Sequence, residues 1–116
     1  MNKLILIGRL TKDSEHRETQ EGKKVLDMNI AVDDGYGENK KTIWIRASLW
    51  GDRGEKLQQY LVKGQQVYVE GRLNHQDGNP RTWGDPVRAS FEIFVNDVVL
   101  LGGKKQEEPE EDYGGF

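Results

Sequence analysis

The 116-residue chain contains no cysteine and only two histidines. Without cysteine it can form neither a disulfide framework nor a thiolate metal site. The histidines, His16 and His75, lie far apart in the sequence, so we do not expect them to share a metal ion. We therefore expect no metal and no other cofactor.

Long apolar runs are also missing. The first one, residues 4–7, is interrupted by Gly8 and Arg9 within the first ten residues. Such a run is too short for the apolar region of a signal peptide or for a membrane span. We expect a cytoplasmic, nucleoid-associated protein, or an organelle-matrix protein that lacks its transit peptide.

The chain is poor in apolar residues, at 34%, and rich in charged ones, at 32%. Its length suits one domain with a modest core, which self-association could supplement. The net charge of −3 lies entirely in residues 104–116, which hold five acidic and two basic side chains. The remaining 103 residues are neutral, which neither indicates nor excludes a polyanionic partner.

Short alternating segments separated by polar, glycine-containing segments predict an all-β fold. The expected strands are 3–10, 25–33, 42–50, 65–73 and 88–101. Gly8 is expected to mark a bend, and a short helix over 54–62 separates the third and fourth strands. Because a small chain cannot leave five strands as an open sheet with exposed edges, we predict a five-stranded OB barrel over residues 1–103. The loops 34–41 and 74–87 should project from it.

The third expected strand, TIWIRASLW, carries the clearest functional signal. Successive side chains of a strand point to opposite faces. One face is apolar and suits a core: Ile43, Ile45, Ala47 and Leu49. The other face presents Trp44, Arg46 and Trp50, and exposed indole surface favours a partner that covers it. Unpaired bases stack on such rings while arginine meets phosphate, although a subunit contact or a cover for the open side of the barrel would also explain them.

Basic and aromatic residues interleave in both projecting loops as well. Tyr36 and Trp83 are therefore expected to help Trp44 and Trp50 stack bases. The expected phosphate contacts are Arg46, Lys40, Lys41, Arg72, Arg81 and Arg88, with Lys3 and Arg9 as weaker candidates. Each of these cations is equally well explained as a solvated surface charge.

Four segments carry a family resemblance: NKLILIGRL, TIWIRASLWG, YLVKGQQVYVEGRL and the LLGG at 100–103. Together they resemble the bacterial-type single-stranded DNA-binding proteins over nearly all of residues 1–103. The resemblance implies an OB barrel, usually a homotetramer, that carries single-stranded DNA on its outside, with contacts from Trp44, Arg46 and Trp50.

The chain departs from the family pattern in three places. Tyr36 stands where a tryptophan is usual, Trp83 is displaced within a longer loop, and Ile45 replaces a frequent histidine. The resemblance assigns the region of Gln66 and Tyr68, on the outer face of the fourth strand, to contacts between dimers. A solvated strand face is the alternative interpretation.

Residues 104–116 are acidic and glycine-rich, so we expect a disordered tail. A solubility tail would be sufficient explanation. A terminal aromatic after an acidic run is also suited to dock in a pocket with basic surroundings. The resemblance implies that such a tail recruits replication and repair proteins, here through Asp112, Tyr113 and Phe116.

The sequence offers no nucleophile–base arrangement, so an enzyme is not expected. We predict sequence-independent binding and protection of single-stranded DNA in replication, recombination and repair. The alternatives are an OB-fold accessory factor of the primosomal type and an RNA-binding module, because stacking alone does not distinguish DNA from RNA.

Overall fold

The computed structural model describes residues 1–74, 81–83 and 88–102, with only the backbone described for Arg81, Trp83, Arg88 and Ala89. The strands are β1 (Leu4–Leu10), β2 (Glu15–Glu18), β3 (Lys24–Asp34), β4 (Lys41–Trp50), β5 (Gln66–Leu73), β6 (Arg81–Trp83) and β7 (Arg88–Leu101). The helical segments are η1 (Gly37–Asn39) and α1 (Arg53–Leu57).

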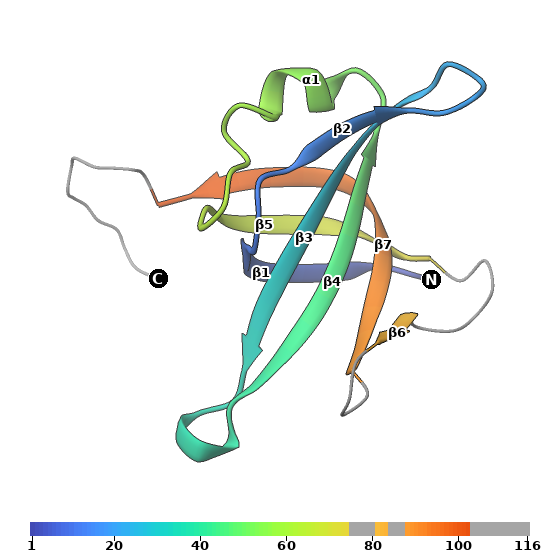
Figure 1. The fold of residues 1–116 in the computed structure, drawn as a ribbon. Coiled ribbons are helices and arrows are strands. Elements are labelled where there is room, and N and C mark those ends of the chain that lie inside the picture. The colour runs from blue at the N-terminus through green and yellow to red at the C-terminus, as the bar shows by residue number, and fades with distance from the viewer. Residues whose placement is uncertain (75–80, 84–87, 103–116) are drawn as a thin grey trace.

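Five of these strands close into a barrel in the order β1-β5-β7-β4-β3, and β1 pairs with β3 to complete it (Figure 1). The β4–β7 contact is parallel, and the other contacts in the ring are antiparallel. The short helix α1 lies between the third and fourth barrel strands along the chain. The predicted five-stranded barrel with its inserted helix is thus confirmed.

The barrel closes where β1 changes partner. Leu4 to Arg9 pair with β5, while Arg9 and Leu10 pair with β3. Gly8 lies at this change, and a Cβ atom there would approach the carbonyl oxygen of Ala31 to 2.6 Å. A residue without a side chain is therefore required at this point, in agreement with the predicted bend.

Apolar side chains fill the barrel interior. They come from all five barrel strands and from the segment after α1: Leu10, Leu26, Met28, Ile30, Val32, Ile45, Ala47, Leu49, Leu61, Val67, Val69, Ile93 and Val95. Interior residues alternate with exterior ones along each strand, as barrel geometry demands. The exterior face of β4 and its neighbours is consequently left to polar and aromatic side chains.

The helix is shorter than the predicted 54–62, because α1 ends at Leu57. Beyond it, the amide of Ser14 donates to the carbonyl of Leu61 at 2.9 Å, and the amide of Gly64 donates to Leu10 at 2.8 Å. Turn bonds continue from the amides of Tyr60 and Leu61 to the carbonyl of Leu57, and the bonds of Ser14 and Gly64 tie this segment to the end of β1. Within the described part of the chain, neither helical segment is long and apolar enough to cross a membrane.

Two short strands, β2 and β6, lie outside the five predicted strands. β2 pairs with β3 inside the polar segment between the first two predicted strands. β6 pairs with the start of β7, inside the expected loop 74–87. β2 forms where β3 extends past β1, and β6 forms where β7 extends past β5. Side-chain patterns do not report such backbone bonds.

Candidate nucleic-acid interface

The two faces of β4 differ as predicted. Ile45, Ala47 and Leu49 are at most 4% exposed and belong to the core. On the opposite face Trp44 is half-buried, and Trp50 keeps 43% of its surface exposed. The tryptophans therefore lie outside the barrel, where a ligand can reach Trp50 directly.

Strand register extends this outer face sideways over three more strands. Ser48 of β4 pairs with Asp27 of β3 on one side and with Phe94 of β7 on the other. Phe94 in turn pairs with Arg72 of β5. These residues form one row across the outer face, and Phe94 lies level with the position between Arg46 and Trp50.

Two hollows open on this face, and Trp50 and Phe94 line both of them. The first, called here the Arg46 hollow, also includes Arg17, Arg46, Asn74 and Glu92. The second, called the Arg72 hollow, also includes Arg53, Arg72, Val95 and Asn96. The two rings thus stand between two depressions, each of which contains two arginines.

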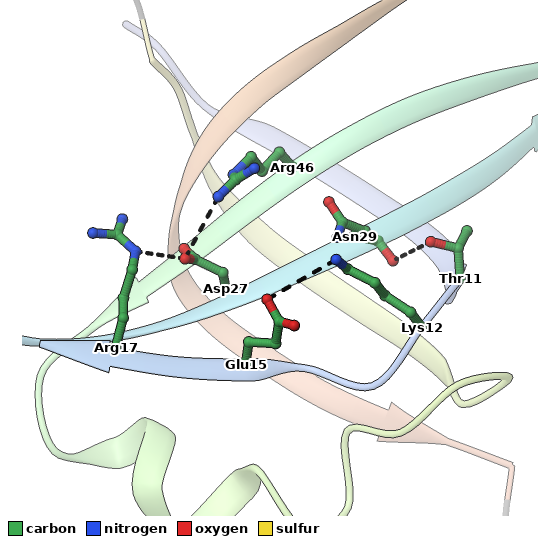
Figure 2. A network of polar contacts seen from close by, with 7 residues as sticks. All are labelled: Thr11, Lys12, Glu15, Arg17, Asp27, Asn29 and Arg46. Atoms are coloured by element: carbon green, nitrogen blue, oxygen red, sulfur yellow. Dashed lines mark hydrogen bonds and ion pairs between the residues drawn. The ribbon is translucent and has the colours of Figure 1, made fainter.

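A nearly buried carboxylate holds the arginines of the first hollow (Figure 2). Asp27 is only 8% exposed. Its Oδ2 accepts a hydrogen bond from Nε of Arg17 at 2.5 Å and lies 3.7 Å from Nη2 of Arg46. Its Oδ1 accepts a bond from Oγ of Ser48 at 3.0 Å. A buried carboxylate needs such partners, and in return it fixes where the two guanidinium groups lie.

The arginines themselves remain accessible. About half of each side chain is exposed, 49% for Arg17 and 48% for Arg46. Figure 2 shows the terminal nitrogens of Arg17 directed away from Asp27. Because a guanidinium carries five N–H donors in a fixed fork, each arginine can bond Asp27 and still donate to a phosphate.

The β3–β4 hairpin carries three more of the predicted contacts and extends away from the barrel (Figure 1). Tyr36 is 90% exposed at its tip. Lys41 is exposed, and Nζ of Lys40 forms an ion pair with Asp33 at 3.3 Å. The hairpin therefore offers a ring and two cations on an arm that continues β4.

Lys3 lies on a different side of the barrel. Its Nζ is 3.1 Å from Oε2 of Glu70, whose Oε1 accepts a hydrogen bond from the hydroxyl of Tyr68 at 3.1 Å. The contact with Lys3, and then that with Tyr68, lowers the pKa of Glu70, and the Glu70 bond raises the pKa of Tyr68. Arg9 pairs with Gln66 in the backbone register of the same two strands, β1 and β5.

This second face, called here the Tyr68 face, is unusually apolar. Ile5, Ile7 and Val99 surround Tyr68 and are 52%, 51% and 44% exposed. Strand register places Ile7 and Val99 on either side of Tyr68. Exposed apolar clusters of this kind mark contacts with other molecules.

Several predicted residues lie partly or wholly outside the described structure. For Arg81, Trp83 and Arg88 only the backbone is described. In the strand register Trp83 pairs with Arg88, and Arg81 pairs with Ser90, which also pairs with Trp44 of β4. The tail residues Asp112, Tyr113 and Phe116 lie outside the described residues. Their predicted roles stay predictions.

Four residues of this interface were not predicted: Arg17, Arg53 and Phe94, which line the hollows, and Asp27, which holds the arginines of the first one. Arg17 lies in the polar segment between the first two predicted strands, and no sequence feature separates Asp27 from the other acidic residues. Phe94 carried a usable signal, because it lies between Ile93 and Val95, which are both buried. A strand with those two positions inside must turn Phe94 outward.

Comparison with known proteins gives a consistent result. The model of the single-strand binding protein family matches residues 1–101. The "Single-stranded DNA-binding protein 1" of Chlorobaculum tepidum is 38% identical over 109 residues, covering 90% of this chain and 67% of the relative. The single-stranded DNA-binding protein of Xanthomonas campestris is 36% identical, over 90% of this chain and 62% of that protein. The chain thus spans about two thirds of the length of these relatives.

Solved structures agree with the sequence relatives. A Plasmodium falciparum SSB in complex with ssDNA superposes with a TM-score of 0.66 at 28% identity, covering 88% of this chain and 96% of that one. A variant of the Thermus aquaticus single-stranded DNA binding protein gives a TM-score of 0.67 at 29% identity, over 90% of this chain and 52% of that one.

The Asp27 contacts lead to a stability prediction. Asp27→Asn removes the charge that holds Arg17 and Arg46, so the free energy of unfolding should fall by about 1.5–3 kcal/mol, because hydrogen bonds to charged groups contribute that much. Urea unfolding measures it. The control is Asp33→Asn, whose carboxylate is 61% exposed in its pair with Lys40 and should change stability by less than about 0.5 kcal/mol. Equal changes in both variants would contradict the prediction.

Proposed function

The chain belongs to the single-strand binding protein family, and from this premise we propose that it binds single-stranded DNA along the outer face of β4, independently of base sequence. One observation carries the proposal. Ile45, Ala47 and Leu49 of β4 are buried, while Trp44, Arg46 and Trp50 lie outside the barrel. Rings with a cation between them suit unpaired nucleotides, whose bases stack and whose phosphates attract arginine.

On this proposal Trp44 and Trp50 stack bases. Tyr36 on the hairpin and Trp83 beside the start of β7 add further rings along the same path. Arg46, together with Arg17, meets the phosphates between the two tryptophans. The remaining predicted cations extend the charged path at its edges: Lys40, Lys41, Arg72, Arg81 and Arg88.

The function that follows is binding and protection of unpaired DNA during replication, recombination and repair. The protein acts by covering its ligand rather than by catalysis. A Plasmodium falciparum family member of similar fold was solved with ssDNA, which supports this choice over the primosomal and RNA-binding alternatives. Lys3 and Arg9 remain weaker candidates, since Lys3 already forms an ion pair with Glu70 on another side of the barrel.

We propose further that the chain forms a homotetramer through the Tyr68 face. Four exposed or half-exposed side chains on three adjacent strands support it: Ile5, Ile7, Tyr68 and Val99. The predicted contact residue Gln66 lies two positions before Tyr68 on β5. Covering this apolar surface would also supplement the modest core of a small barrel.

Residues 104–116 support a third proposal, partner recruitment. Their acidic run and two aromatic residues suit a basic pocket on another protein. We propose that Asp112, Tyr113 and Phe116 make that contact with replication and repair proteins. The support here is the sequence alone.

The stacking proposal is tested by Trp44→Ala. Loss of one stacked base should weaken binding by about 1–3 kcal/mol, roughly 5- to 150-fold, and equally on oligo(dT), oligo(dA) and oligo(dC). Fluorescence of the remaining tryptophans follows the titrations. Tyr60→Ala is the matched control, because Tyr60 is 54% exposed and lies outside β4.

A loss confined to one base type would contradict sequence-independent stacking, and so would an equal loss in the Tyr60 variant. Competition with poly(U) and with duplex DNA in the same assay separates the RNA-binding alternative. Poly(U) that competes as well as poly(dT) would favour it.

The assembly proposal is tested by Ile7→Asp. A charge in the middle of the Tyr68 face must be desolvated in an assembly, so the molar mass at micromolar concentration should fall toward the 13.3 kDa of one chain. Light scattering measures it. Val62→Asp, at a position 41% exposed, should leave the mass unchanged. A wild-type protein that is already monomeric would overturn the proposal.

The tail proposal is tested by Phe116→Ala. Removing the ring should weaken binding of a replication or repair protein by about tenfold or more, because a buried aromatic anchor dominates small interfaces. Affinity for oligo(dT) should stay unchanged. Equal partner binding by both forms, measured by calorimetry with the purified partner, would show that Phe116 is not the anchor.

A further inference from the structure

Phe94 is a ring on this outer face that the binding path proposed above does not use. It lies on β7 in direct register with Ser48 and Arg72. Together with Trp50 it lines both the Arg46 hollow and the Arg72 hollow. A ring that forms a wall of two depressions can contact a ligand on more than one side.

The Arg72 hollow has the chemistry of a nucleotide site. It is an open depression of about 460 Å³. Two rings, Trp50 and Phe94, and two arginines, Arg53 and Arg72, line it. It adjoins the proposed DNA path at Trp50, so a strand that stacks on Trp50 reaches it without leaving the protein.

Both arginines of the hollow are held in place. The guanidinium carbon of Arg72 lies 5.2 Å from the centre of the Phe94 ring, within the range of a cation–π contact. Arg53 donates a hydrogen bond to the carbonyl of Asn96 and lies 3.9 Å from Asp97. Its side chain still keeps 56% of its surface exposed. Positively charged groups that are fixed before binding lose less freedom when a phosphate arrives.

We propose that the Arg72 hollow is a second nucleotide subsite, in which one base of the single strand stacks on Phe94 while Arg53 and Arg72 meet the adjoining phosphates. This inference rests on the proposed function, since it lengthens the same DNA path from β4 over β7 toward α1. Recognition is by stacking and charge, so any base fits.

A purely structural role for Phe94 makes a different prediction. Arg72 and Phe94 are cross-strand neighbours, and such pairs stabilise a sheet by themselves. In that case loss of the ring would lower stability and would weaken binding regardless of whether the strand carries bases. Whether the loss of affinity requires bases in the strand therefore distinguishes a stacking role of Phe94 from a purely structural one.

The experiment compares Phe94→Leu and Phe94→Ala with the wild type on oligo(dT) and on an oligomer of the same length without bases. Leucine keeps an apolar side chain between β4 and β5 but has no π face. Both variants should bind oligo(dT) roughly 5- to 100-fold more weakly. They should lose much less affinity for the base-free strand, which senses only the loss of the ring contact that positions Arg72. Phe91→Ala is the control, because Phe91 is 40% exposed on the opposite face of the same strand.

The two arginines give a second, independent readout. Arg53→Ala and Arg72→Ala should weaken binding to both oligomers, and each should reduce the slope of log affinity against log salt by about 0.7, the value for one phosphate contact on a single strand. Circular dichroism and thermal unfolding establish that each variant is folded. If both Phe94 variants unfold, the salt slopes of Arg53→Ala and Arg72→Ala decide whether the subsite exists.

Wild-type affinity of the Phe94 variants for oligo(dT), or an equal loss on the two oligomers, would overturn the subsite. Unchanged salt slopes in both arginine variants would overturn it as well. Failure of the proposed function looks different: the wild type would not bind oligo(dT), or Trp44→Ala would bind as tightly as the wild type. The same titrations therefore distinguish the two failures.

Discussion

The pairing of β3 with β4 is the constraint on which the outer face depends. The register runs without interruption from Val25 opposite Trp50 to Asp34 opposite Lys41. A slip of one residue would turn every side chain of β4 to the other face. The core prevents this, because Ile45 and its alternate neighbours fill the barrel and a tryptophan in their place would not fit. The position of the tryptophans outside is therefore a consequence of the packing inside.

Asp27 shows how a neutral barrel can present an organised cationic surface. Burying a carboxylate is unfavourable unless charged or hydrogen-bonding groups meet it. Asp27 is met by Arg17, Arg46 and Ser48, and the half-exposed arginines cover it. The carboxylate cancels part of their charge, yet it restricts their motion at the place where a phosphate would approach. Local arrangement, rather than net charge, determines what this face can bind.

The sequence predicted the elements that depend on local periodicity. Alternation in TIWIRASLW assigned both faces of β4 correctly, and Gly8 marked the change of partner in β1. What the sequence missed depends on which strands lie side by side. Asp27 becomes important only because β2 and β4 place Arg17 and Ser48 against it. Phe94 belongs to a long apolar strand, where alternation is blurred by the apolar residues around it. The end of the helix at Leu57 depends on bonds to a distant segment.

The bonding of the polar groups on this face helps to explain why binding should be independent of base sequence. Reading a base requires donors and acceptors that are free to meet its edge. Here the carboxylate of Asp27 is occupied by its partners, and Glu92 accepts a hydrogen bond from Asn74 at 3.3 Å. The rings of Trp50 and Phe94 and the outer edges of the guanidinium groups face a ligand in both hollows. Every base has a π face and every nucleotide a phosphate, so such a surface accepts any sequence.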